Sequence, residues 1–296
     1  MARSAAQLEQ LNRAEKGVFV AVLGGVFENA PWVAERAWAV RPFATVADLH
    51  RAMSGAVATA GEADQLAFIR GHPELGAKVG QASAMTGESR REQGSLGLDR
   101  LSEAEFARFG QLNAEYRARF GIPFIICVRR HTRASILGEF ERRLGNAAER
   151  ERAAALEEIG HITRLRLNEA VDGPGKPKTD GRLSTHVLDT VSGRPAAGVR
   201  VALTERGASA EGLLRETTTN ADGRTDEPLI GGVPLRIGTY EIAFHIGAYF
   251  AAKGIAAATP PFLDVVPIRF SIAEPEGHYH VPLLASPWSY STYRGS

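Results

Sequence analysis

The sequence predicts two domains of different class, an all-helical N-terminal domain over residues 1–172 and a β-sandwich over residues 181–296. In the first part, apolar residues recur at helical spacing, and in the second they alternate with polar ones, as in half-buried strands. Between them, residues 173–180 hold two prolines, two glycines and no aliphatic or aromatic side chain, a composition typical of a linker. A chain of 296 residues is long enough for two domains.

The helical part opens with an apolar run over residues 18–27. Phe19, Leu23 and Phe27 follow one another at four-residue steps, which is the stripe of an amphipathic helix. Acidic residues flank the run on both sides, so we interpret it as a packed helix and not as a signal peptide.

Three further helices are predicted before the linker. Ser102 and Glu105 form a capping box that starts the first of them, and Pro123 is expected to end it. The other two are expected over about residues 132–144 and 147–171, separated by a Gly-Asn break. No strand with period-two alternation is expected in this half.

The second part has the pattern of an antiparallel sandwich. Alternating apolar residues mark strands around 199–203, 240–244 and 266–270, and turn signals at Ser192-Gly193, Asn220–Gly223 and Glu274–Gly277 separate them. A first strand is expected over Leu183–Asp189 and a late one over His278–His280, with both imidazoles of the late strand on one face.

Composition excludes several classes of function. The 35 basic and 34 acidic residues leave no basic excess for sequence-independent binding to nucleic acid. No apolar stretch is long enough to span a bilayer. The single cysteine, Cys127, rules out an intrachain disulfide and a cysteine-based zinc cluster, and it is expected to be buried in its apolar run. We therefore expect a cytoplasmic protein whose partners are neither nucleic acid nor membrane.

Three histidines and one arginine stand out in the second part. His186 lies in the first strand, His278 and His280 in the late strand, and Arg224 after the Asn-x-Asp-Gly turn. They are compatible with ordinary histidines, with a three-histidine zinc site, or with a metal-free site in which imidazoles move protons and an arginine stabilises an anion. The residues alone leave these alternatives open.

Four segments of this part resemble the 5-hydroxyisourate hydrolases of the transthyretin-like family. They are Leu183–Thr190 with Gly193–Pro195, Thr219–Arg224, His278–Leu284 and Ser286–Ser296, and the last ends in the specific sequence Tyr-Arg-Gly-Ser. The resemblance implies a transthyretin-type sandwich, assembled as a tetramer, that hydrolyses 5-hydroxyisourate without a metal. It implies catalytic roles for His186, Arg224, His280 and Ser296, and substrate-binding roles for Tyr293, Arg294 and Gly295. A small-molecule carrier of the same fold is the rival interpretation.

The helical part carries a less obvious group of candidates. Pro73 pushes His72 out of helical geometry. Ser89, Glu92 and Gln93 would share one helix face, which without further information is most often a solvated surface. Arg166 lies along an apolar stripe, where a charge needs an ion-pair partner, a snorkelling route to solvent or an anionic ligand.

Several segments of this part resemble the 2-oxo-4-hydroxy-4-carboxy-5-ureidoimidazoline (OHCU) decarboxylases. They are Leu11-Asn12, Phe27–Trp32, Arg41–Phe43, Leu66–Lys78, Ser89–Gln93, Leu112-Asn113, Phe120–Ile126 and Ile136-Leu137. The resemblance implies an all-helical, dimeric, cofactor-free enzyme with His72 and Glu92 as catalytic residues, His72 handling the proton and held by Glu92. The implied substrate-binding residues are Pro73, Ser89, Gln93, the backbone of Ile125, Ile126, Cys127 and Val128, and Arg166.

The two resemblances together predict a bifunctional enzyme of urate catabolism that needs no cofactor or metal. The C-terminal domain would hydrolyse 5-hydroxyisourate to OHCU, and the N-terminal domain would decarboxylate OHCU to S-allantoin. Its partners would be purine-derived small molecules, and it would form a homo-oligomer with dimeric decarboxylase contacts and a tetrameric hydrolase core. The alternatives are that only the hydrolase is active, or that the C-terminal domain is a carrier.

Overall fold

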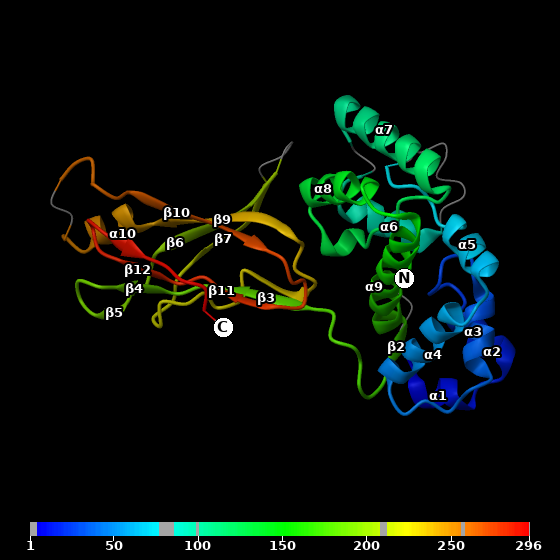
Figure 1. Cartoon of the computed structure of the whole chain (residues 1–296). Coiled ribbons are helices and arrows are strands. Elements are labelled where there is room, and N and C mark those ends of the chain that lie inside the picture. Colours follow the sequence, from blue (N-terminus) through cyan, green and yellow to red (C-terminus); the bar gives the residue numbers. More distant parts are fainter. Residues whose placement is uncertain (1–4, 77–85, 99–100, 208–211, 256–257, 296) are drawn as a thin grey trace. The chain divides into compact units, whose positions relative to one another are not determined.

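The computed structural model describes residues 5–76, 86–98, 101–207, 212–255 and 258–295 (Figure 1). It divides into two compact units, one of Met1–Arg129 with Ile136–Lys178 and the other of Arg130–Ser135 with Thr179–Ser296. The chain is helical up to about residue 170 and strand-rich afterwards, which confirms the predicted fold class. Among the described residues, no helix is both long and apolar enough to cross a membrane.

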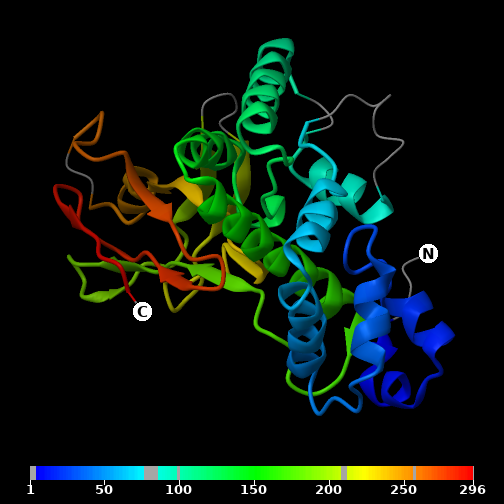
Figure 2. The ribbon, with the colours of Figure 1, turned by 45° about the vertical axis from the view of Figure 1, so that its right-hand side comes forward.

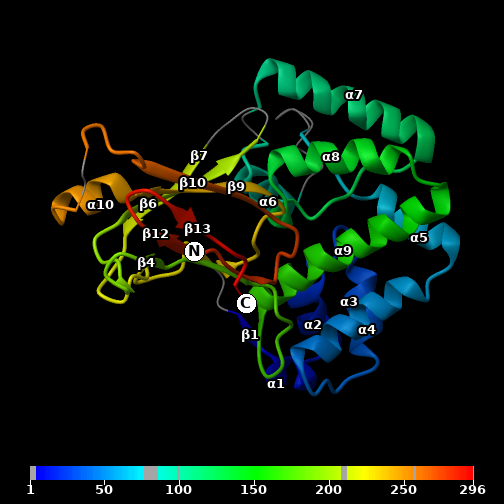
Figure 3. The same cartoon turned by 60° about the vertical axis from the view of Figure 1, so that its left-hand side comes forward.

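The helices follow the chain in short segments and then longer ones. They are α1 (Leu8–Arg13), α2 (Lys16–Leu23), α3 (Pro31–Trp38), α4 (Val46–Ala58), α5 (Glu62–Arg70), α6 (Gly87–Ser95), α7 (Glu103–Phe120), the 3-10 helix η2 (Val128–Arg130), α8 (Arg133–Leu144) and α9 (Ala148–Ala170). Figures 2 and 3 show α9 crossing the helical unit, with α2 and α4 packed along it.

The predicted helix boundaries are correct to within a few residues, with two instructive differences. The run over residues 18–27 is helical only to Leu23, and Phe27 is buried beyond the helix end. The capping box of Ser102 and Glu105 is confirmed at the start of α7. That helix ends at Gly121, whose left-handed φ of 66° stops it before Pro123 is reached.

One pairing in the helical unit was not expected. The strand β1 (Ala6–Gln7) pairs in parallel with β2 (Val171–Asp172), so the start of the helical unit is tied to the end of α9. Two-residue strands carry too few residues to show period-two alternation in a sequence.

Most of the expected linker is anchored to the helical unit. The carbonyls of Pro174 and Gly175 accept hydrogen bonds of 3.0 and 3.1 Å from the first backbone amides of α4, and Pro177 accepts one of 2.7 Å from Asn168 of α9. At Gly173 a Cβ atom would lie 2.8 Å from Cβ of Leu8, so this close approach requires glycine. Residues 178–180 remain as the connecting segment.

Over the residues described for it, the strand-rich unit pairs its strands in three sheets. The strands are β3 (Gly181–Ser184), β4 (Val187–Asp189), β5 (Arg194–Pro195), β6 (Arg200–Arg206), β7 (Gly212–Thr218), β8 (Ile230–Val233), β9 (Gly238–His245), β10 (Val265–Ile272), β11 (His278–His280), β12 (Leu283–Ala285) and β13 (Tyr290–Ser291), with the helix α10 (Ile246–Ala252) after β9. The sheet orders are β10-β9-β6-β7, β11-β3-β8 and β13-β12-β4-β5 (Figure 1).

The alternation read from the sequence places the core of this unit correctly. Leu203, Ile242 and Ile268 lie opposite one another on β6, β9 and β10, and all three are buried. The helix α10 was not predicted.

The predicted first strand is broken at the point where it carries a histidine. β3 pairs in parallel with β11, and β4 pairs in parallel with β12, while Thr185 and His186 lie between the two halves. On the partner side the break falls at Val281 and Pro282, and proline has no amide hydrogen to give to a ladder. The break leaves His186 and His280 facing each other across the two interrupted strands.

Candidate active sites

His186 and His280 form a hydrogen-bonded pair in the strand-rich unit. Nδ1 of His186 lies 2.7 Å from Nε2 of His280, and the ring centroids are 4.9 Å apart with nearly parallel planes. His280 is only 9% exposed, and its Nδ1 lies 2.9 Å from Oγ of Ser184. Three of the four ring nitrogens therefore have partners. Among the described residues, Nε2 of His186 has none.

The surroundings favour the neutral form of both rings. Burial, followed by the fields of His186, Arg224, His278 and Arg182, lowers the pKa of His280 to about 4. Burial and Arg224 lower the pKa of His186 as well. Near neutral pH the pair is uncharged and can accept a proton.

Arg224 reaches this pair from a tight turn. The amide of Arg224 donates a 3.2 Å hydrogen bond to Oδ1 of Asn220, and residue 224 forms an antiparallel bridge with His186. Gly223 has φ of 70°, and a Cβ there would lie 2.4 Å from the carbonyl oxygen of Val187, so only glycine fits. The turn thus brings a permanent positive charge to the imidazole pair.

The end of the chain returns to the same place. The amide of Gly295 donates a 2.8 Å hydrogen bond to the carbonyl of His280. A Cβ at Gly295 would lie 2.8 Å from Cδ2 of the imidazole, so this contact needs glycine too. Arg294 lies over the ring of Tyr279, 4.6 Å from its centroid, and the side chain of Tyr293 is exposed. Ser296, predicted to be catalytic, lies outside the described residues.

The arrangement of these histidines is that of a hydrogen-bonded chain. The facing nitrogens of His186 and His280 are at hydrogen-bond distance from each other, so their lone pairs do not converge on a common point. Among the residues that the structure describes, no group of three or more His, Cys, Asp or Glu side chains is placed to hold a metal ion.

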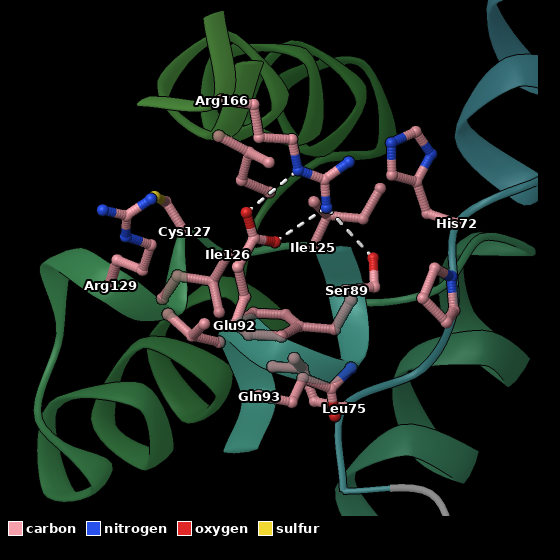
Figure 4. Close-up of a pocket in the computed structure, with 14 residues that line it drawn as sticks. His72, Leu75, Ser89, Glu92, Gln93, Ile125, Ile126, Cys127, Arg129 and Arg166 are labelled. Carbon is pink, nitrogen blue, oxygen red and sulfur yellow. Dashed lines mark hydrogen bonds and ion pairs between the residues drawn. The ribbon is translucent and has the colours of Figure 1, made fainter. Parts of the chain in front are cut away.

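The helical unit gathers every site residue predicted for it around one pocket (Figure 4). The predicted residues that line it are His72, Pro73, Ser89, Glu92, Gln93, Ile125, Ile126, Cys127, Val128 and Arg166. They come from the loop after α5, from α6, from the segment after α7, and from α9.

Arg166 is held by two buried carboxylates. Its Nε and Nη2 donate to Glu92 at 2.9 and 2.7 Å, its Nη1 donates to Glu28 at 2.8 Å, and Nη2 also donates to Oγ of Ser89 at 3.1 Å. Burial lowers the pKa of Arg166, but Glu92 and Glu28 outweigh it and raise that pKa overall. The charge on the apolar stripe of α9 is therefore paired.

Glu28 is a member of this site that the sequence analysis did not single out. It is 2% exposed, and it also accepts hydrogen bonds from Oγ1 of Thr86, the N-cap residue of α6. Glu28 thereby connects Arg166 to the start of the helix that carries Ser89 and Glu92. The available signal was its position directly after Phe27, at the end of a buried apolar stripe.

His72 is oriented by a backbone carbonyl. Nδ1 of His72 donates to the carbonyl of Phe68 at 3.1 Å, and the Phe68 ring packs edge-on against the imidazole. Because a carbonyl only accepts, neutral His72 carries its hydrogen on Nδ1 and presents a lone pair at Nε2. Burial lowers the pKa of His72 to about 4, so the neutral form prevails near neutral pH. The expectation that Glu92 holds His72 is wrong: Glu92 is bonded to Arg166, and no hydrogen bond of the described residues joins it to His72.

Gln93 secures the loop that follows His72. Its Oε1 accepts from the amide of Gly76 at 3.2 Å, and its Nε2 donates to the carbonyl of Glu74 at 3.3 Å. The amide predicted to bind substrate is thus used to shape the pocket beside Pro73.

The wall formed by residues 125–128 is fixed from behind by charged side chains. Arg143, 2% exposed, donates to the carbonyl of Ile125 at 2.8 Å, and the amide of Cys127 donates to Glu158 at 2.8 Å. Arg143 is itself bonded to buried Glu151 and Tyr116. The sequence analysis missed this support.

Known proteins match each of the two units. The family model described as OHCU decarboxylase matches residues 12–168, and that of the HIUase/transthyretin family matches residues 183–295. A 5-hydroxyisourate hydrolase of Deinococcus radiodurans is 58% identical over 115 residues, which are 38% of this chain and 95% of that protein. An OHCU decarboxylase of Halalkalicoccus jeotgali is 41% identical over 162 residues, 55% of this chain and 90% of that protein.

One solved structure has counterparts of both parts in a single chain. The crystal structure of an (S)-allantoin synthase is 35% identical, covers 98% of this chain and 100% of its own, and aligns with a TM-score of 0.52. The chain therefore belongs to the OHCU decarboxylase family through its helical part and to the HIUase/transthyretin family through its strand-rich part, a fusion of the two.

Proposed function

We propose that this chain catalyses two consecutive reactions of urate degradation. The strand-rich unit opens the six-membered ring of 5-hydroxyisourate with water to give OHCU, and the helical unit removes carbon dioxide from OHCU to give S-allantoin. The observation that carries the first step is the neutral His186–His280 pair, in which one imidazole nitrogen has no partner among the residues that the structure describes. The names of the relatives support the substrates.

In the hydrolysis, His186 is the base. Its Nε2 takes a proton from water while the oxygen of that water bonds to the ring carbonyl carbon, and the negative charge on the carbonyl oxygen is stabilised by Arg224. The carbon–nitrogen bond then breaks, and the leaving nitrogen takes up a proton. Gly295 keeps the chain end against His280, and we propose substrate-binding roles for Tyr293 and Arg294 and a catalytic role for Ser296.

In the decarboxylation, His72 moves one proton between two atoms of the substrate. The carbon–carbon bond to the carboxylate breaks, and its electron pair enters the conjugated C=N of the ring, where the nitrogen takes up a proton. This leaves an enol. Nε2 of His72 accepts the enol proton and returns it to the neighbouring ring carbon on one face, which sets the configuration of the product.

Arg166 is better suited to positioning than to binding the substrate carboxylate. Its guanidinium already donates to Glu28, Glu92 and Ser89, and one arginine with two carboxylates carries a net negative charge. We propose that this cluster, in which Ser89 accepts from Arg166 and donates to Glu28, holds α6 in place, and that substrate contacts come from His72 and Pro73 and from the backbone of Ile126 and Val128.

We propose that the protein is a cytoplasmic homo-oligomer whose partners are purine-derived small molecules. Its only cysteine is buried and has no second cysteine in the chain for a disulfide, which suits a reducing compartment. Trp288, Tyr290 and Tyr293 are about half exposed near the end of the chain, and such aromatic side chains are common at interfaces between subunits. Dimeric contacts of the helical unit and a tetrameric core of strand-rich units are the expected assembly, and sedimentation analysis would measure it.

The ultraviolet decay of freshly prepared 5-hydroxyisourate tests the function. The chain should accelerate it, and the His186→Ala variant should not. Exhaustive chelation should leave the rate unchanged. Decay at the uncatalysed rate, with stoichiometric binding of the compound, would indicate a carrier. Fast hydrolysis without any acceleration of the decarboxylation would show that only the hydrolase is active.

A further inference from the structure

Ser184 lies between two imidazoles of the strand-rich unit. Its Oγ is 2.9 Å from Nδ1 of His280 and 3.1 Å from Nε2 of His278. β3 and β11 pair with Ser184 opposite His280, and this register brings the three side chains to one face. With the 2.7 Å contact between His186 and His280, three hydrogen bonds in series lead from the base of the proposed hydrolysis to His278.

The imidazoles of this series differ in their access to water. His280 is buried, whereas His278 is exposed. The first nitrogen of the series, Nε2 of His186, faces the proposed substrate, and the last ring is in contact with solvent. The hydroxyl of Ser184 bridges the buried and the exposed imidazole.

Ring opening by water creates a reason for such a connection. The product is a carboxylic acid, and an acid of this kind has a pKa of roughly 3.3–3.7, so it ionises near neutral pH. Each turnover therefore releases one proton beyond the one that the leaving nitrogen takes up. The proton must leave a pocket whose central imidazole is buried.

The hydrogen bonds can run in either of two directions. In the resting direction, Nδ1 of His186 donates to Nε2 of His280, Nδ1 of His280 donates to Oγ of Ser184, and the hydroxyl donates to Nε2 of His278. When Nε2 of His186 accepts a proton, each of these hydrogens can shift one place outward, and His278 becomes the imidazolium. It then loses the proton from Nδ1 to water or buffer, and every group has kept its number of bonds.

We propose that Ser184 and His278 are proton-transfer residues that carry the proton of hydrolysis from the His186–His280 pair to solvent. The proposal rests on the hydrolase function proposed above. Neither residue touches the ring that is opened in this assignment, so both should affect turnover more than substrate binding.

The charges around the pair favour this outward direction. The groups whose fields act on His280 are His186, Arg224, His278 and Arg182, and each of them is a cation or can become one. An imidazolium at His280 would lie among positive charges with little water to screen them. At exposed His278 the same proton is hydrated.

Buffer dependence of hydrolysis tests the proposal. In the full chain at low buffer concentration, His278→Ala should lower kcat for 5-hydroxyisourate by roughly 10- to 100-fold and leave KM unchanged. This loss is no larger than the smallest losses that are typical when a positioned proton-transfer group is removed. Added imidazole should restore kcat, because it can replace the missing exposed ring. Ser184→Ala should also lower kcat, but imidazole should not restore it, because the missing hydroxyl lies between two protein side chains. Ser184→Thr keeps a hydroxyl and should have nearly wild-type kcat.

The control is His245→Ala, which removes another histidine of the same unit that is bonded to Arg200. It should show wild-type kcat with no dependence on buffer. Wild-type kcat in both His278→Ala and Ser184→Ala would overturn the proton path, and so would a loss in His278→Ala that imidazole does not repair while the fold is intact by circular dichroism. If the wild-type chain does not hydrolyse 5-hydroxyisourate, the proposed function itself fails, and that outcome is distinct from the other two.

Discussion

Replacing Glu28 by glutamine tests whether the buried charge cluster holds the helical unit together. Glutamine keeps the shape, and an amide oxygen at the position of Oε2 can still accept from both Arg166 and Thr86, but it carries no negative charge to pair with the guanidinium. The charge assistance of the Arg166 hydrogen bond is lost, together with the bond from the Thr86 amide to Oε1, and a charge-assisted hydrogen bond typically contributes about 1.5–3 kcal/mol. Arg166 keeps Glu92 as a partner, so the loss should stay below the roughly 3–5 kcal/mol for stranding a buried charge.

Thermal unfolding followed by circular dichroism at the helix band measures this loss. For a unit of this size each kcal/mol lowers Tm by about 2–4 °C, so Glu28→Gln should lower it by roughly 3–12 °C. The matched control is Glu9→Gln, which removes an exposed pair with Arg13 and should cost less than about 1 kcal/mol. An unchanged Tm for Glu28→Gln would refute the reasoning.

The same pair of proteins gives a pH test with a definite sign. Burial raises the pKa of Glu28, but Arg166 and the hydroxyl donors outweigh it, so the pKa of the folded state is below the ordinary value of 4.5. The carboxylate therefore stabilises the fold above about pH 4.5, and this contribution is lost as pH falls through the folded-state pKa. The difference in stability between wild type and Glu28→Gln should be constant from pH 8 to 6 and shrink in acid, and a difference that grows in acid would contradict the assignment.

Three further predictions follow from single features of the structure. Gly295→Ala should reduce hydrolysis at least tenfold, because its Cβ would lie 2.8 Å from the ring of His280. Gly212→Ala, which has open space around its Cβ position, should hydrolyse at the wild-type rate. Equal rates for the two variants would show that the chain end is not part of the site. Because the pKa values of both His186 and His280 are lowered from the ordinary 6.5, hydrolysis should stay constant from pH 8 to 6.5 and decline only in more acidic solution, where protonation of the pair removes the base, and a pH profile with an acid limb at 6.5 would disagree. A fragment of residues 1–178 should melt at a higher temperature than one of residues 1–172, since only the longer one keeps the backbone hydrogen bonds to α4, and identical melting curves would argue against that anchoring.

Periodicity predicted the secondary structure well because it reflects burial directly. The stripe of Phe19 and Leu23 and the alternation of Leu203 and Ile242 both correspond to buried faces. What it could not predict were features set by contacts distant in sequence. The break at Thr185 and the anchoring of residues 173–177 depend on partners that no local pattern reveals.

The site residues divide in the same way. His72 and Arg166 stand out by residue type and context, and the structure places them at one pocket. Glu28 lies 138 positions from Arg166, so only the fold brings the two together. Ser184 could have been found: it is two residues before His186, and strand alternation puts both on one face.

The hydrogen-bond partner that orients His72 could not be predicted from the sequence either. A glutamate on a neighbouring helix was the plausible partner, but the acceptor is the carbonyl of Phe68, four residues earlier in the chain. Backbone acceptors have no signature in residue type. This difference matters for the chemistry, because it makes the resting imidazole a proton acceptor at Nε2.

The optical activity of the product tests the central claim most directly. Starting from 5-hydroxyisourate, the wild-type chain should form S-allantoin quickly, seen as a growing circular dichroism signal of the product. His72→Ala should hydrolyse 5-hydroxyisourate at the wild-type rate, accumulate OHCU and release racemic allantoin slowly, with no lasting signal. Racemic allantoin from the wild-type chain, or S-allantoin from His72→Ala at the wild-type rate, would contradict the assignment of the second reaction to the helical unit.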